Sequence, residues 1–392
     1  MPAGDCTTGY PMDAPARPLF SHSYARDDFS FSTPSRIAYE GGKLRLRHYA
    51  PVEPARSTPI LFVYALTKRA FILDLAPGRS VVESLARQGF HVYLTDWIAP
   101  ASSDSSRGLD AYVNEDLVNA VQVIAAERRT SQVSIIGYCL GALLGVIYTA
   151  LHPRQVRNLV ALTVPLEMSA TPTLVPTWLS AQTVELITTL YGNCPAWISS
   201  ALTSARLMAR MARFRAEIRG DKECSQVFDR FLHWIDSDVP MAGQLFREVA
   251  IDIFAQNRLV RGELAVGGEP INLRRIVCPL LNVVASFDEL VPPRACEPLT
   301  QLVRSRDKAT VVFPSSHVGA AAGLGAHEKL WLAVGQWLAV RDSPPQRRLR
   351  RSKATAVQEG LSREGLSNGI YEKIEIPQLR HTIHREEENG RT

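Results

Sequence analysis

The chain has 392 residues, of which 46% are hydrophobic and 21% are charged. These proportions exclude a collagen-like repeat, a small disulfide-stapled domain and a chain disordered throughout. They fit one large α/β domain, or a core domain that carries an insertion. The net charge is +5, and an excess of three positive charges falls in residues 341–392. The rest of the chain is therefore close to neutral, which argues against nucleic-acid binding by its folded part.

The six cysteines are widely spaced and form no C-x-x-C pair. Because zinc sites and redox dithiols need such close pairs, we expect no metal and no cofactor. The first 20 residues lack the apolar run of a secretory signal. We therefore expect a cytoplasmic protein with reduced thiols.

Short apolar runs alternate with helical patterns along most of the chain. An alternating run at 44–49 predicts a strand with one exposed face. Near-continuous apolar runs, typical of strands buried on both faces, lie at 59–66, 90–97, 133–137 and 158–165, and two more runs that predict strands follow at 279–286 and 309–314. Helical spacing of apolar residues predicts helices at 80–89, 111–128 and 328–340. This alternation predicts an α/β fold with a mostly parallel, doubly wound sheet.

Residues 166–275 depart from this alternation of strand and helix patterns. They contain helical patterns such as 204–220 and three of the six Trp, but no strong strand run. We predict a mostly helical cap there, inserted between two parts of the core at 36–165 and 276–340. Residues 1–35 are then an N-terminal extension. Residues 341–392 form a polar tail with few large apolar residues, for which we predict disorder apart from a strand or helix near 370–376.

The stretch VSIIGYCLGALLGVIYTALH, residues 133–152, has the length of a membrane span and no formal charge. However, it begins with a β-branched run that ends at Gly137, its second half has a helical pattern, and arginines flank both of its ends. A buried strand, a tight turn and a buried helix account for the same residues.

The turn in this stretch has the form G-x-nucleophile-x-G, with Cys139 at its centre between Gly137 and Gly141. Such an elbow exposes a nucleophile on a strained strand-to-helix turn. The start of a helix favours a thiolate, and the next backbone N–H, that of Leu140, can face an oxyanion. A buried structural cysteine in a Gly-rich turn is the alternative.

Two further residues fall in the chain order that this fold uses, which is nucleophile, acid and then His. Asp288 follows the run at 279–286, and His317 follows the run at 309–314. Parallel strands bring the loops after them to one edge of the sheet, where such folds place their sites. Taken alone, Asp288 and His317 are each better explained by a structural role in a turn or in the core. The occurrence of all three residues in the expected order, each after a predicted strand, favours a Cys139–Asp288–His317 triad instead. His327 is a weaker candidate because it lies at a helix entrance.

A cysteine nucleophile points to acyl transfer from a thioester. Moving an acyl group from one sulfur to another changes the bond energy little, so the acyl-enzyme stays activated toward an alcohol. His317 would then act as general base, with Asp288 supporting it. Because water would compete with the alcohol, the helical insertion would serve as a lid.

These residues resemble the catalytic subunits of polyhydroxyalkanoate synthases. The likeness runs from about Tyr39 to Leu338, and its distinctive segments are VYALTKRAFILDLAPGRSVVESLARQGFHVYLTDW, GYCLGA, RQVRNLVALTVPLEM, FREVAIDIFAQNRLVRGEL, NVVASFDELVPP and SSHVG. The resemblance implies an α/β-hydrolase fold with a cap, a triad of Cys139, Asp288 and His317, and oxyanion donors at the backbone N–H groups of Leu140 and Thr67.

The resemblance also implies a function. Such enzymes polymerise (R)-3-hydroxyacyl-CoA, here expected to be short-chain such as 3-hydroxybutyryl-CoA, into polyester with release of CoA. The chain's length resembles the short class, which works with a non-catalytic subunit. The expected partners are thus the acyl-CoA, the growing polyester, that second subunit and a second copy of the chain in a homodimer. The expected location is the surface of cytoplasmic polyester granules.

The chain departs from the family pattern at a few positions. Lys68 stands where the family usually has Asn, Ala142 replaces a Gly after the elbow, and Ser316 replaces the Gly before the His. Two other functions therefore stay open. One is a Cys-type hydrolase or thioesterase that gives the acyl group to water, as dienelactone hydrolases do. The other is a granule scaffold that has lost activity.

Overall fold

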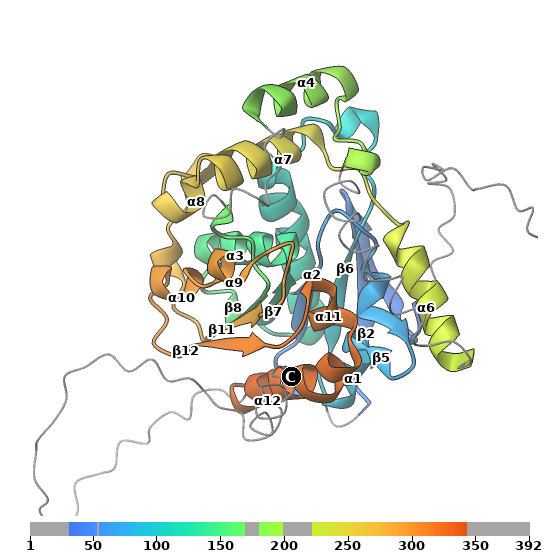
Figure 1. Cartoon of the computed structure of the whole chain (residues 1–392). Helices are drawn as coiled ribbons and strands as arrows, with labels where there is room; N and C mark the ends of the chain where they lie inside the picture. Colours follow the sequence, from blue (N-terminus) through green and yellow to red (C-terminus); the bar gives the residue numbers. More distant parts are fainter. Residues whose placement is uncertain (1–30, 53–54, 169–179, 199–221, 343–392) are drawn as a thin grey trace, which may run out of the picture. The chain divides into compact units, whose positions relative to one another are not determined.

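The computed structural model describes residues 31–52, 55–168, 180–198 and 222–342 (Figure 1). Three sequence predictions lie outside these residues. They concern most of the N-terminal extension, the helical pattern at 204–220 and nearly all of the tail at 341–392.

An eight-stranded sheet forms the core, in the order β1-β2-β6-β3-β7-β8-β11-β12. The first two strands are antiparallel, and the other six run parallel to one another. The strands are β1 Arg36–Gly41, β2 Leu44–Tyr49, β3 Ile60–Val63, β6 Val92–Trp97, β7 Val133–Tyr138, β8 Val156–Leu162, β11 Leu280–Ala285 and β12 Lys308–Phe313. The mostly parallel α/β sheet predicted from the sequence is confirmed.

Helices cover both faces of this sheet, and the register shows which face each one covers. Leu61 of β3 pairs with Ile135 of β7, so these two side chains share a face and Phe62 points to the other. Ile135 packs beneath Gly145 of α3 (Leu140–Leu151), whereas the ring of Phe62 lies 5.8 Å from that of Trp331 in α12 (Trp331–Val340). The helices α3 and α12 therefore lie on opposite faces. Helix α1 (Val81–Arg87) packs against α12.

Two predicted helices begin in π-helical form. The helix predicted at 111–128 consists of a π-helix, Ala111–Leu117, followed by α2, Val118–Arg128. The helix predicted at 328–340 is likewise preceded by a π-helix, Ala326–Leu330. The strand β1 was missed because RIAYEG has a half-exposed, mixed composition without clean alternation.

The segment between β8 and β11 is helical in most of its described part. It contains α4 (Ala181–Tyr191), α6 (Lys222–Ile235), α7 (Gly243–Arg247), a π-helix (Glu248–Ala255), α8 (Arg258–Arg261) and a short hairpin of β9 (Ala265–Val266) and β10 (Glu269–Pro270). Figure 1 shows α4 and α7 above the sheet, and α6 packs against η1 (Ala70–Leu73) and β4 (Asp74–Ala76). We call this segment the cap.

The remaining described elements are short. They are η1 (Ala70–Leu73), β4 (Asp74–Ala76), β5 (Arg79–Ser80), η2 (Ser102–Asp104), η6 (Leu273–Arg275), α9 (Pro293–Cys296), α10 (Leu299–Leu302) and α11 (His317–Ala322). Among the helices in the described ranges, none combines the length and the apolar character that crossing a bilayer requires.

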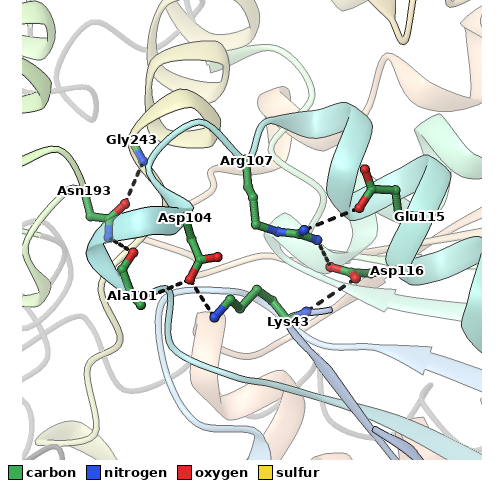
Figure 2. A network of polar contacts seen from close by, with 8 residues as sticks. All are labelled: Lys43, Ala101, Asp104, Arg107, Glu115, Asp116, Asn193 and Gly243. Atoms are coloured by element: carbon green, nitrogen blue, oxygen red, sulfur yellow. Dashed lines mark hydrogen bonds and ion pairs between the residues drawn. The ribbon is translucent and has the colours of Figure 1, made fainter. Parts of the chain in front are cut away.

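A polar network joins the cap to the loop after β6 (Figure 2). The side chain of Asn193 donates to the Ala101 carbonyl at 2.8 Å and accepts from the Gly243 N–H at 3.3 Å. In the same region, Arg107 donates to Asp116 at 2.8 Å. Burial raises the pKa of Asp116 to about 6, although the charge of Arg107 opposes this rise. We call the contacts of Asn193 with Ala101 and Gly243 the Asn193 anchor.

Candidate active site

Cys139 occupies the turn between β7 and α3 in a strained backbone conformation. Its φ is 56° and its ψ is −124°, values that a non-glycine residue adopts only where the surrounding structure enforces them. Its N–H donates to the Leu162 carbonyl of β8 at 3.0 Å. The side chain is partly exposed. The strand, tight turn and helix predicted for residues 133–152 are therefore confirmed.

The two glycines of the turn are required by close backbone approaches. A Cβ at Gly137 would collide with the backbone of Ala142, and a Cβ at Gly141 would collide with the Val63 carbonyl and the backbone of Tyr64. Neither position has room for a side chain. The second contact also brings the chain leaving β3 against the start of α3.

Asp288 and His317 come together at the same edge of the sheet, in the loops after β11 and β12. One carboxylate oxygen of Asp288 accepts from the N–H groups of Leu290 and Val291, each at 2.8 Å. The other oxygen lies 2.7 Å from Nδ1 of His317. Both residues are buried. The backbone N–H groups hold the carboxylate in place, and the carboxylate in turn orients the imidazole. Because this contact uses Nδ1, it leaves Nε2 of His317 able to exchange a proton with a reacting group.

The electrostatics of His317 favour the imidazolium. Burial alone lowers the pKa of His317, but the negative charges of Asp288 and Cys139 and hydrogen bonds to both side chains raise it well above its usual value. The structure therefore connects His317 to both of the other predicted triad residues. A thiolate at Cys139 would face a positive charge in this arrangement.

The other described cysteines offer no comparable nucleophile. Cys194, Cys278 and Cys296 are buried. Burial raises the pKa of the Cys278 thiol to about 12, and it raises that of Cys296 well above its usual value. Among the residues with described coordinates, no group of three His, Cys, Asp or Glu side chains could hold a metal ion.

Neighbouring residues fix His317 in place. The Tyr138 hydroxyl donates to the His317 carbonyl at 3.2 Å, and the two ring centroids are 5.1 Å apart. Ser316 is the N-cap of α11, and its side chain accepts from the Gly319 N–H. The departure from the family's Gly at position 316 thus supplies a helix cap. Sequence reasoning did not anticipate the part played by Tyr138.

The two predicted oxyanion donors lie on adjoining segments. Leu140 is the first residue of α3, where helical N–H groups have no partner within the helix. Thr67 lies in the loop after β3, the strand whose last residue, Val63, contacts Gly141. The carbonyl of Thr67 accepts from the Val239 N–H of the cap at 2.9 Å.

His327 is separate from this arrangement. It is buried on the π-helix Ala326–Leu330, and neither ring nitrogen has a hydrogen-bond partner within the described residues. Burial lowers the pKa of His327 to about 4. The ring that contacts Asp288 is that of His317.

The raised pKa of His317 predicts a pH-dependent contribution to stability. A group whose folded pKa lies above its unfolded value, about 6.5 for His, contributes fully below that value and loses the contribution as pH rises through the folded pKa. We expect the difference in unfolding free energy between wild type and His317→Gln to be largest below about pH 6.5, the ordinary pKa of His, and to shrink as the pH rises above it. Urea denaturation at each pH measures it, and a difference that grows with pH would contradict the expectation.

Comparisons with known proteins agree with this geometry. The family described as alpha/beta hydrolase fold matches residues 58–319. Solved structures that share the fold include a monoacylglycerol lipase of Paleococcus ferrophilus, with a TM-score of 0.53, 16% identity and coverage of 76% of this chain and 100% of the lipase. A thermophilic esterase of Thermogutta terrifontis has a TM-score of 0.50 at 14% identity and covers 78% of this chain and 97% of its own.

Several relatives that are at least 30% identical to this chain carry the name poly(3-hydroxyalkanoate) polymerase subunit PhaC. The Haloferax mediterranei protein is 33% identical over 79% of this chain, which spans 64% of that relative's length. The Thiocystis violacea protein is 31% identical over 78% of this chain and 88% of its own length. The Synechocystis protein is 30% identical over 79% of this chain and 85% of its own length. The chain therefore has the α/β-hydrolase fold and belongs to the PhaC family of poly(3-hydroxyalkanoate) polymerase enzymes.

Proposed function

We propose that this chain polymerises (R)-3-hydroxyacyl-CoA, with short-chain substrates such as 3-hydroxybutyryl-CoA, into polyester and releases CoA. The observation that carries the proposal is the partly exposed cysteine on the nucleophile turn, next to an imidazole that a buried carboxylate orients. The names of the relatives support the same reaction.

In the first half of the proposed reaction, Sγ of Cys139 attacks the thioester carbonyl carbon. The negative charge on the carbonyl oxygen is stabilised by the N–H groups of Leu140 and Thr67. The bond between the acyl carbon and the CoA sulfur then breaks, and His317 gives its proton to the departing thiolate. The products are CoA and an acyl group bound to Cys139.

In the second half, a hydroxyl group attacks the acyl carbon held on Cys139. Neutral His317 takes the hydroxyl proton, an ester bond forms and Sγ leaves as thiolate beside the imidazolium. The polyester grows by repetition of these two halves. Asp288 keeps the imidazole in one orientation throughout.

The relatives are named as polymerase subunits, which favours a second, non-catalytic subunit as partner of this chain. We include that subunit in the proposal, together with a homodimer and a location at the surface of polyester granules. No cofactor is needed, because the substrate thioester supplies the energy of ester formation.

Product analysis tests the proposed function. Radiolabelled 3-hydroxybutyryl-CoA is incubated with the chain alone and with candidate partner subunits, and polymer and free acid are separated and counted. We expect CoA release with label in polymer. Label only in free acid would identify a thioesterase or hydrolase, and no CoA release under any condition would identify a scaffold.

A further inference from the structure

Lys68 is a charged side chain buried in the loop between β3 and η1. It is 6% exposed, a degree of burial that lysine tolerates only when it is paired. Its Nζ lies 2.7 Å from an oxygen of Asp238 and 2.6 Å from the Ile235 carbonyl. It also lies 5.4 Å from the centre of the Trp234 ring. All three partners belong to the cap.

The same two segments meet at further points. We call residues 64–69 the entrance loop and residues 234–239 the cap segment. The Val239 N–H donates to the Thr67 carbonyl at 2.9 Å. The indole N–H of Trp234 donates to the Arg69 carbonyl at 3.0 Å and lies 3.2 Å from the Tyr64 hydroxyl. The entrance loop is therefore joined to the cap segment along its length.

The core holds the two ends of the entrance loop. At one end, the N–H of Tyr64 donates to the Thr95 side chain at 2.9 Å and the Tyr64 carbonyl accepts from the indole N–H of Trp97 at 2.8 Å. At the other end, the Arg69 side chain donates to the Trp97 carbonyl at 3.2 Å. The contacts at Thr67 and Lys68, in the middle of the loop, come from the cap segment.

We propose that Lys68 and Asp238 are a positioning pair that holds the entrance loop against the cap and thereby sets the place of the Thr67 N–H at the oxyanion. This inference rests on the proposed function, since it assigns Thr67 a role in acyl transfer. The cap then takes part in stabilising the transition state as well as excluding water. Oxyanion donors act only when they are held in place before the reaction, so freeing the loop lowers the rate of acylation.

The test compares two reactions of Cys139 that differ in one respect. In acylation by 3-hydroxybutyryl-CoA, negative charge develops on the carbonyl oxygen of the thioester. In alkylation by iodoacetamide, the Cys139 sulfur displaces iodide and no negative charge develops on a carbonyl oxygen. We expect Lys68→Met to slow single-turnover acylation at saturating substrate by about 10²-fold, the usual effect of losing one oxyanion donor. Alkylation, followed by mass spectrometry of the Cys139 peptide, should keep its wild-type rate.

Two further variants keep the test decisive. Asp238→Asn retains an acceptor oxygen for Lys68 and should slow acylation in the same direction but less, so it tests the pair even if Lys68→Met fails to fold. Asn193→Ala is the matched control, because it breaks the Asn193 anchor between cap and core without touching the entrance loop. Its acylation rate should equal that of the wild type.

Each outcome decides the inference. Unchanged acylation in Lys68→Met and Asp238→Asn would overturn it, and so would an equal slowing of acylation and alkylation. If Asn193→Ala slows acylation as much as Lys68→Met does, the effect comes from attachment of the cap in general. That result would overturn the specific positioning role of Lys68 and Asp238. A wild-type protein that is alkylated at Cys139 but never acylated would overturn the proposed function instead, and the inference with it.

Discussion

Replacement of Cys139 by alanine is expected to abolish CoA release from (R)-3-hydroxyacyl-CoA, with a loss of at least about 10⁴-fold. Losses of this size follow removal of a nucleophile whose neighbours cannot replace it. The other described cysteines, Cys194, Cys278 and Cys296, are buried, and burial raises the pKa of the Cys278 and Cys296 thiols, so none is placed to substitute for it. Released CoA is measured by its reaction with a chromogenic disulfide.

The Cys139→Ala protein should still fold, which makes the assay interpretable. The strain at this position arises from the positive φ of the backbone, and an alanine there has the same Cβ and therefore a similar strain energy. Circular dichroism and the melting temperature provide the control. CoA release at the wild-type rate from a folded Cys139→Ala protein would contradict both the assigned nucleophile and the acyl-transfer mechanism.

His317→Gln is expected to lower the rate of acyl transfer by about 10³-fold or more, because glutamine can neither take a proton from the attacking hydroxyl nor give one to the leaving CoA. The substitution also removes the positive charge beside Cys139. Alkylation of Cys139 by iodoacetamide should therefore slow as well, in contrast to Lys68→Met. Single-turnover acylation and peptide-resolved alkylation measure the two effects.

The neighbouring His327 supplies the matched control for this substitution. It is also a buried histidine, but its ring nitrogens have no hydrogen-bond partner within the described part of the chain. His327→Gln should therefore transfer acyl groups at the wild-type rate. A larger loss in His327→Gln than in His317→Gln would mean that the acid–base residue had been assigned to the wrong histidine.

Most of the sheet was predictable because strands buried on both faces have sequences unlike those of exposed segments. The run at 133–137 overlaps β7, and the run at 279–286 contains β11, each to within one or two residues. The rule that the loops after parallel strands lie at one edge then predicted that Cys139, Asp288 and His317 come together. A strand such as β1, which is half exposed at the edge of the sheet, lacks this signature.

The sequence could not have predicted the contacts between the entrance loop and the cap. Lys68 and Asp238 lie 170 positions apart, and neither has a local pattern that points to the other. A lysine in a loop is normally solvated, so its burial depends wholly on a partner brought close by the tertiary fold. In the sequence alone, Lys68 therefore stands out only as a departure from the Asn that is usual in the family.

The place of β12 in the sheet has a consequence for how the enzyme would fail. Within the described ranges this strand lies at the edge of the sheet and pairs with β11 alone, whereas β7 is paired on both sides, with β3 and β8. His317 therefore follows an edge strand, whereas Cys139 follows a strand in the middle of the sheet, which is expected to open later. Under mild denaturation we expect the proposed acid–base group, His317, to leave its place while Cys139 remains on an intact turn, so that activity is lost before the protein unfolds.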